Sequence, residues 1–152
     1  MTALRRGAWV GLKYVTTVFF AGVIVQFFLV GYGLFAMKHG GNTTIDNAKS
    51  LDAHRGLGFI LSDFGAILLL ILALLAWPAR RLRMAWILLA VLAFVQGILA
   101  TVGFHHWGVG MFHPVNALLL LGLSGRLAHY AWTSGKTASA AETAPPAAAP
   151  SG

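Results

Sequence analysis

The chain has 152 residues, of which 58% are hydrophobic and 10% charged, and it contains no cysteine. Soluble domains average roughly 25% charged residues, so this composition excludes a solvated globular domain, a disordered chain and a disulfide scaffold. A membrane span needs roughly 20 apolar residues, and the apolar content suffices for about four of them. We therefore predict an all-α fold, an integral membrane four-helix bundle.

Four apolar stretches follow one another along the chain, and we predict that each forms a membrane-spanning helix. They cover, in chain order, residues 14–37, 56–77, 84–103 and 115–132. Each is long enough to cross a hydrocarbon core of about 30 Å as an α-helix. The four helices are expected to form one domain over residues 1–133. The segment 134–152 is rich in Ala, Pro and Ser and has no large apolar side chain, which predicts a disordered tail.

The basic residues are distributed unevenly between the two ends of the predicted helices. Most lie before the first helix, between the second and third, or at the end of the fourth: Arg5, Arg6, Lys13, Arg80, Arg81, Arg83, Arg126 and Lys136. Because basic loops are retained in the cytoplasm, this pattern predicts that both termini are cytoplasmic. The net charge of +7 is then explained by clusters of basic residues that orient the helices in the membrane. We therefore expect no nucleic-acid partner.

The first and third helices share a short pattern, Val-Gln-x-x-Leu-x-x-x-Gly, over residues 25–33 and 95–103. A histidine opens the helix that follows each of them, His54 in one case and His113 in the other. The chain therefore resembles two similar hairpins that start on the same side of the membrane, which is a parallel repeat. The alternative is a chance match between two apolar helices.

This spacing places Gln26 and Gly33 on one face of the first helix, and Gln96 and Gly103 on one face of the third. An amide in hydrocarbon needs a hydrogen-bonding partner, so we predict that both faces point into the bundle. At 1.5 Å per residue, the glycines would lie about 10 Å nearer the outer surface than the glutamines. We expect them at the level of the two histidines, where they would leave room for a flat cofactor.

His54 and His113 are the strongest candidates for chemistry. Two imidazoles from different helices of a bundle are suited to be the axial ligands of a haem iron. We therefore predict a b-type haem with these two residues as metal ligands. Arg55 would pair with a haem propionate, and Asn116 would form a hydrogen bond nearby. The four residues of the shared pattern named above would complete the cofactor-binding set.

The histidines also have a structural interpretation. Pro114 is ordinary in the first turn of a helix, so His113 would then belong to a cap. Asp52 would cap the second helix, with His54 in its first turn. On this interpretation the protein is a non-enzymatic membrane scaffold or accessory subunit with structural histidines.

Asp63 is the one acidic residue deep in a predicted span. Intramembrane acids are costly and mark proton paths, ion sites or paired partners. A hydrogen-bonded layer with Gln26 and Gln96 is one expectation, and a protonated carboxyl that links helices is another.

A separate alternative for the histidines is a zinc or copper site built by His54 or His113 with three further histidines, namely His39, His105 and His106.

The chain lacks the motifs of hydrolases and nucleotide-binding enzymes, so we favour a protein that is not an enzyme.

The chain resembles a family of small bacterial four-span proteins of unknown function, over about residues 10–132. The resemblance is in the motifs Val-Gln-x-x-Leu, His54-Arg55-x-Leu-Gly and His113-Pro-Val-Asn116. More distantly, the layout is similar to one half of haem A synthase, whose halves bind a b-type haem through histidines on the second and fourth helices. These resemblances imply a bacterial inner-membrane protein that binds haem for electron transfer or haem handling, together with a membrane redox partner or a second copy. The acid used in that enzyme's catalysis has no counterpart here.

Overall fold

The computed structural model describes residues 2–39 and 49–142 and shows an all-α bundle. The first hairpin consists of α1 (Ala3–His39) and a second rod with four consecutive parts: η1 (Lys49–Leu51), α2 (Asp52–Phe59), η2 (Ile60–Gly65) and α3 (Ala66–Ala76). The second hairpin consists of α4 (Arg80–His105), the short α5 (Trp107–Gly110) and α6 (Phe112–Glu142). These elements provide four helices that are long and apolar enough to cross a membrane, which confirms the predicted fold class.

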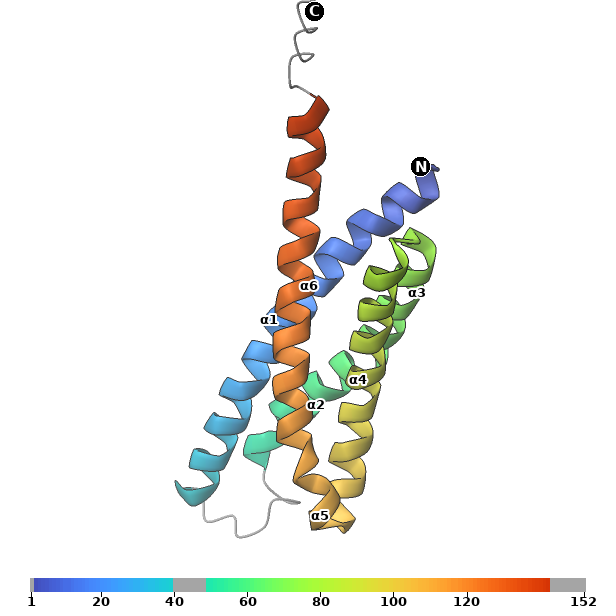
Figure 1. The fold of residues 1–152 in the computed structure, drawn as a ribbon. Helices are drawn as coiled ribbons and strands as arrows, with labels where there is room; N and C mark the ends of the chain where they lie inside the picture. Colours follow the sequence, from blue (N-terminus) through green and yellow to red (C-terminus); the bar gives the residue numbers. More distant parts are fainter. Residues whose placement is uncertain (1, 40–48, 143–152) are drawn as a thin grey trace, which may run out of the picture.

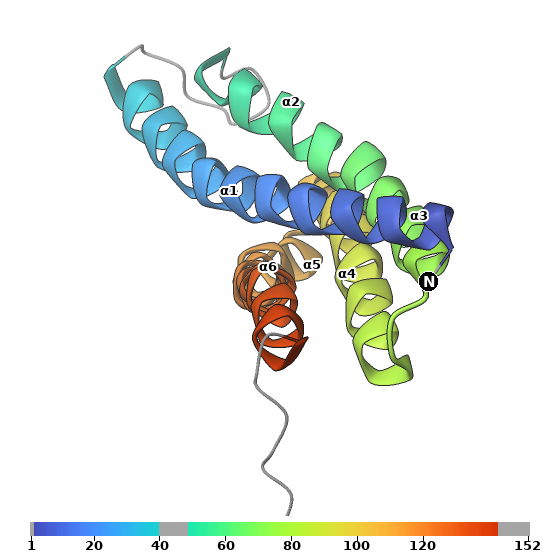
Figure 2. The same ribbon diagram turned by 90° about the horizontal axis from the view of Figure 1, so that it is seen from above.

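The four rods pack as a ring. Helix α1 contacts α3 and α6, and α4 contacts the same two helices, so that α1 and α4 are diagonal neighbours. Figure 1 shows α1 beginning and α6 ending at the same end of the bundle, while α2 and α5 lie at the opposite end. Seen from above in Figure 2, α1 runs beside the α2–α3 rod, with α4 and α6 on its other side. We call the end that carries His54 and His113 the histidine end.

The helices are longer than the apolar stretches that predicted them. Helix α1 begins at Ala3 and not near residue 14, and α4 begins at Arg80 and not near residue 84. Hydropathy detects only the part of a helix that lies in hydrocarbon. Arginine and lysine are good helix formers, so basic flanks continue the helix into the headgroup region.

The last helix is also longer than predicted. Helix α6 continues to Glu142, past the expected end near residue 132, because residues 137–142 are rich in Ala and contain neither Gly nor Pro, which favours the helix. The remaining part of the predicted disordered tail, residues 143–152, lies outside the described residues.

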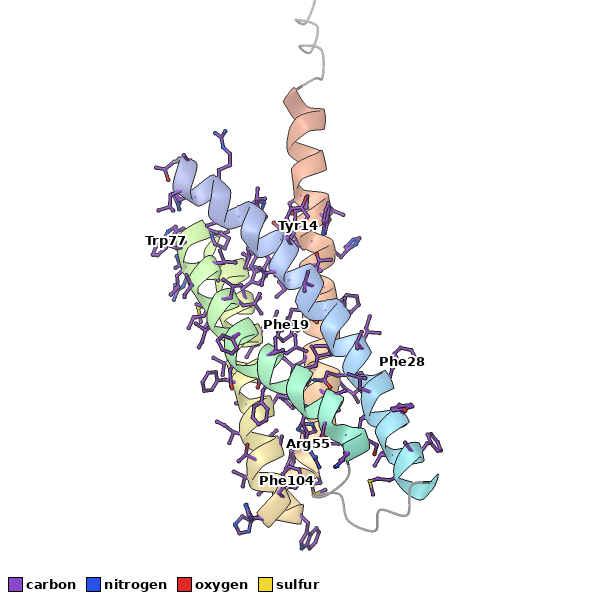
Figure 3. The ribbon with its side chains drawn as sticks, turned by 180° about the vertical axis from the view of Figure 1, so that it is seen from behind. Tyr14, Phe19, Phe28, Arg55, Trp77 and Phe104 are labelled. Atoms are coloured by element: carbon purple, nitrogen blue, oxygen red, sulfur yellow. The ribbon has the colours of Figure 1, made fainter. Side chains whose placement is uncertain are left out.

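The core of the bundle contains many alanines beside larger apolar residues such as Phe19 and Trp86. Its buried positions include Ala66, Ala73, Ala76, Ala90, Ala93 and Ala131. Many large apolar side chains face outward: Phe28 is 73% exposed and Phe64 is 75% exposed. Figure 3 shows Phe28 projecting away from the bundle, whereas Phe19 lies between helices. Small residues at helix contacts and large ones toward the surroundings are typical of helices packed in lipid, which supports a multi-pass membrane protein.

Residues 70 positions apart in α1 and α4, the offset between Gln26 and Gln96, occupy matching places in the ring. Thr16 and Trp86 are one such pair. The Trp86 Nε1–H donates a hydrogen bond of 3.0 Å to Thr16 Oγ1, and both residues are fully buried. Matching residues meet each other only near an axis that relates the two halves. The predicted parallel repeat therefore has a structural counterpart at the centre of the bundle.

Candidate functional site

The two glutamines of the shared pattern make the same contact in both hairpins. The Gln26 Nε2 amide donates to the backbone carbonyl of His54 at 3.0 Å. The Gln96 Nε2 amide donates to the backbone carbonyl of His113 at 3.1 Å. A carbonyl in the first turns of a helix normally accepts a bond from the residue four positions later, and here it also receives one from the neighbouring helix. Each glutamine thereby joins the two helices of its hairpin at a histidine.

The two histidines face each other across the bundle. Their ring centroids are 6.4 Å apart, with the ring planes at 76° to one another. Both side chains are partly buried. His54 comes from α2 and His113 from α6, two rods that are not neighbours in the ring. The structure therefore brings the two candidate residues into contact.

The hydrogen bonds of His54 define the tautomer of its neutral ring. Its Nδ1 lies 3.3 Å from the backbone carbonyl oxygen of Gln26. A carbonyl can only accept, so Nδ1 carries the proton and the lone pair is on Nε2. Metal-ligating histidines commonly donate their other ring N–H to a backbone carbonyl in this manner. The arrangement leaves His54 Nε2 free to accept a proton donor or a metal ion.

His113 is held differently. Its Nε2 is 3.2 Å from the Gln96 Nε2 amide, which donates to it, and its buried Nδ1 has no hydrogen-bond partner among the described residues. Asn116 orients Gln96, because its Nδ2 amide donates to Gln96 Oε1 at 2.7 Å and to the Leu92 carbonyl at 2.9 Å. The second hairpin thus has an extra amide that the first lacks. Correspondingly, Gln26 Oε1 is buried without a partner in the described part of the chain.

The two glycines are not beside the imidazoles, which corrects the expected arrangement. Gly33 packs against Leu51, and its carbonyl accepts a 2.9 Å bond from Ser50. Gly103 packs against Gly110. Leu51 and Gly110 each precede a site histidine by three residues, so the glycines lie one turn nearer the histidine end. The glutamines, and not the glycines, share the level of the histidines, and the glycines allow close packing within each hairpin.

The contact at Gly103 leads to a prediction about stability. A Cβ atom on Gly103 would lie 2.7 Å from the Cα of Gly110, a backbone atom that cannot move away easily. We expect Gly103→Ala to lower the free energy of unfolding by about 1–3 kcal/mol, as overpacking does. The matched control is Gly31→Ala, where a Cβ meets nothing within 4 Å. That variant should be neutral or slightly stabilising in SDS-induced unfolding of the detergent-solubilised protein. Equal stability of the two variants would contradict the close approach.

Arg55 lies at the histidine end of α2 (Figure 3). Its Nη1 donates to Asp52 Oδ1 at 3.0 Å, an ion pair between residues one turn apart. The cap predicted for Asp52 is wrong: the residue preceding α2 is Leu51, with no side-chain cap, and Asp52 binds Arg55 instead.

Asp63 does not join the glutamines in one polar layer, contrary to expectation. It lies in η2, a π-helical segment in the middle of the second rod, and its side chain is exposed on the bundle surface. Within residues 2–39 and 49–142 its hydrogen-bond partner is Ser62, whose hydroxyl donates to Asp63 Oδ1 at 3.5 Å. The glutamines bind the histidine carbonyls instead. The His54 carbonyl lies about two turns from Asp63 along the same rod. The sequence does contain a signal for the unusual position of Asp63, namely the polar pair Ser62-Asp63 followed by Gly65. An average of hydropathy over the span does not detect it.

The alternative zinc or copper site receives no support. Across the described ranges, no group of three or more His, Asp or Glu side chains is placed to hold a metal ion. His105 and His106 are both exposed at the histidine end. The side chain of His39 lies outside the described part of the chain.

Comparisons with protein-family models, with curated proteins and with solved structures found no match for this chain.

Proposed function

We propose that this multi-pass membrane protein binds a b-type haem between His54 and His113 and serves electron transfer or haem handling. The observation that carries the proposal is the 6.4 Å separation of the two imidazole centroids. Two imidazoles that share one metal ion, at about 2.0 Å from each ligating nitrogen, have their ring centres about 6 Å apart. The donors, their separation and their origin on different rods suit a pair of axial ligands.

A haem fits this donor set better than a bare metal ion does. A protein-bound zinc ion takes three or four protein ligands, and the described residues hold no cluster of three. Haem iron receives four nitrogen ligands from its own macrocycle and needs only one or two from the protein. Two facing histidines without a third ligand are therefore the expected arrangement for a haem.

The residues around the histidines have definite roles in this proposal. Gln26, through its carbonyl, keeps the His54 lone pair on Nε2. Gln96 donates to His113 Nε2 and to the His113 carbonyl, so it can release the ring and still hold the helix. Arg55, which lies at the histidine end, would pair with a haem propionate by charge. When bound, the haem would supply a one-electron redox centre.

The membrane and the orientation belong to the same proposal. The basic residues cluster at the end opposite the histidines, where α1 begins, α3 passes to α4 and α6 ends. Basic segments are retained in the cytoplasm. We accordingly infer a bacterial inner membrane, cytoplasmic termini and a haem near the outer surface. This placement agrees with the resemblance to small bacterial four-span proteins and to one half of haem A synthase, and it would let a membrane redox partner or a second copy approach the haem.

The second candidate is a scaffold or accessory subunit whose histidines are structural. It is favoured by one observation: Gln26 and Gln96 bind backbone carbonyls of the histidines, a contact that any residue at positions 54 and 113 would provide. On this proposal, alanine at both positions leaves the binding of the protein to its membrane partner unchanged.

The experiment that separates the two is absorption spectroscopy of the protein purified after expression with supplemented haem. We expect a Soret band that shifts when dithionite reduces the sample, and about one haem per chain by the pyridine haemochrome assay, because one histidine pair holds one iron. A colourless, iron-free preparation that is folded by circular dichroism would overturn the haem proposal and leave the scaffold.

A further inference from the structure

Asp63 lies near the middle of the second span, which runs from Lys49 to Ala76, yet its side chain is exposed. A carboxyl group facing hydrocarbon is expensive, and acids within membrane spans commonly mark functional sites. Burying it against another helix would reduce this cost, but its one hydrogen-bond partner in the described ranges is Ser62 on the same segment. The position therefore calls for a polar partner that arrives from the membrane.

The backbone around Asp63 is also unusual. Residues 60–65 form a π-helical turn between α2 and α3. Such turns insert an extra residue into an α-helix and occur frequently at functional sites. Ser62 is turned into the bundle, where a Cβ atom on the facing Gly97 would lie 3.0 Å from its hydroxyl. Close approach of α4 at this glycine keeps Ser62 inside and leaves Asp63 at the edge of the contact.

A groove of about 310 Å³ adjoins Asp63 between η2 and α4. Its lining combines apolar side chains with two polar ones: Phe59, Phe94, Ile98 and Val102 with Asp63 and Thr101. The volume is at the lower end of the range for small-molecule sites. Apolar walls with a few polar groups are typical of sites that fix a ligand's orientation by hydrogen bonds.

The chemistry of the groove restricts its occupant. The occupant must be soluble in the membrane, because the groove opens in the middle of a span. It must offer a hydroxyl donor to the carboxylate of Asp63. Phe59 and Phe94 are exposed aromatic rings, 58% and 48% respectively, and suit a flat ring between or against them.

A second copy of the chain is a weaker occupant. The parts of the spans at the depth of Asp63 carry no lysine or arginine, since residues 14–37, 56–76, 84–103 and 115–125 contain neither. A second copy would therefore bring no cation to the carboxylate.

We propose that this groove binds a membrane-dissolved quinol, with a ring hydroxyl donating to the Asp63 carboxylate and the ring lying against Phe59 and Phe94. The site lies on η2 and α4 and does not depend on the haem. Thr101, whose Oγ1 donates to the Gly97 carbonyl at 3.0 Å, keeps lone pairs that can accept from the second hydroxyl.

The test measures binding of a radiolabelled decyl-benzoquinol to the full-length protein in lipid nanodiscs. Wild-type protein should bind saturably, at about one quinol per chain. Asp63→Leu removes the acceptor and should weaken binding about tenfold or more, since the ring hydroxyl would be left without a hydrogen-bond partner in an apolar groove. Thr101→Phe fills the groove and should act similarly. Leu118→Phe, at an exposed position on another helix, is the matched control and should bind like wild type.

Two outcomes would overturn the proposal. The first is that wild-type protein does not bind the quinol, or that Asp63→Leu and Thr101→Phe both bind it as well as wild type does. The other is a second copy covering the groove: because the chain has no cysteine, Ile98→Cys would then form a disulfide-linked dimer in the membrane. Repeating the binding measurement on the double variant His54→Ala/His113→Ala separates this proposal from the haem. Quinol binding that survives there, with or without a Soret band in wild type, leaves the groove proposal standing by itself.

Discussion

Alanine at His54 or at His113 is expected to abolish the low-spin Soret band of the haem-loaded protein and to lower haem occupancy more than tenfold. Loss of one histidine would leave the iron with a single protein bond, and even the loss of a group that hydrogen-bonds to a metal ligand commonly costs about 10–100-fold in affinity. The bundle itself should remain folded, because Gln26 and Gln96 also bind the backbone carbonyls at these positions, and alanine keeps those carbonyls. Haem occupancy is measured by the pyridine haemochrome assay on monodisperse protein.

The matched controls are His105→Ala and His106→Ala, since both residues are exposed at the same end of the bundle. They should retain full haem occupancy. A further control adds imidazole to His113→Ala, where the small ligand would enter the space vacated by the ring and restore the band. If the histidine variants keep wild-type spectra, His54 and His113 are not the ligands of the iron, and other residues hold the haem.

The second large effect concerns the centre of the bundle. Trp86 is fully buried and makes edge-to-face contacts with Trp9, at a centroid distance of 5.6 Å, and with Tyr130, at 6.5 Å. Its Nε1–H donates to Thr16 Oγ1, which in turn donates to the Leu12 carbonyl at 2.7 Å. We expect Trp86→Ala to lower the free energy of unfolding by about 3 kcal/mol. This lies at the low end for tryptophan because unfolded helices in a bilayer stay in lipid, so the loss is of packing and hydrogen bonding and not of transfer from water.

The measurement is again SDS-induced unfolding, with two comparison variants. Trp86→Phe keeps most of the ring volume and loses the hydrogen bond to Thr16, which should cost about 1 kcal/mol. Trp107→Ala removes a tryptophan that is 88% exposed, and its effect should be within about 0.5 kcal/mol of zero. A Trp86→Ala variant as stable as Trp107→Ala would show that the two halves do not meet at this residue.

Part of the candidate site was predictable because it repeats. The shared pattern identified Gln26 and Gln96 as inward-facing, and both turn out to reach across to the following helix. The pairing of His54 with His113 followed from their equivalent places in the two hairpins. The level of each residue along the bundle was not predictable, because it depends on how two helices slide past one another. The glutamines therefore met the histidines, and the glycines met Leu51 and Gly110.

The exposed position of Asp63 was not predictable for a different reason. Counting 100° per residue assumes a regular α-helix, and the π-helical turn at residues 60–65 breaks that regularity. The close approach at Gly97 also determines that Ser62 is buried and Asp63 is not. The approach involves a different helix, which is remote in sequence from the residues that it positions.

Composition and pattern by themselves determined that this chain makes four spanning helices, how its basic residues are sorted between the two ends, and which polar residues repeat. These properties follow from the cost of placing charges and unpaired backbone groups in hydrocarbon, a cost that each segment bears independently of the others. The tertiary structure decided the contacts through which the polar residues meet: the imidazoles that the repeat pairs face each other across the bundle, the glutamines bind histidine carbonyls, and one carboxylate is left at a groove. Those contacts join residues 17 to 59 positions apart in the chain, and they depend on the axial offset and rotation of packed helices, which no single segment specifies.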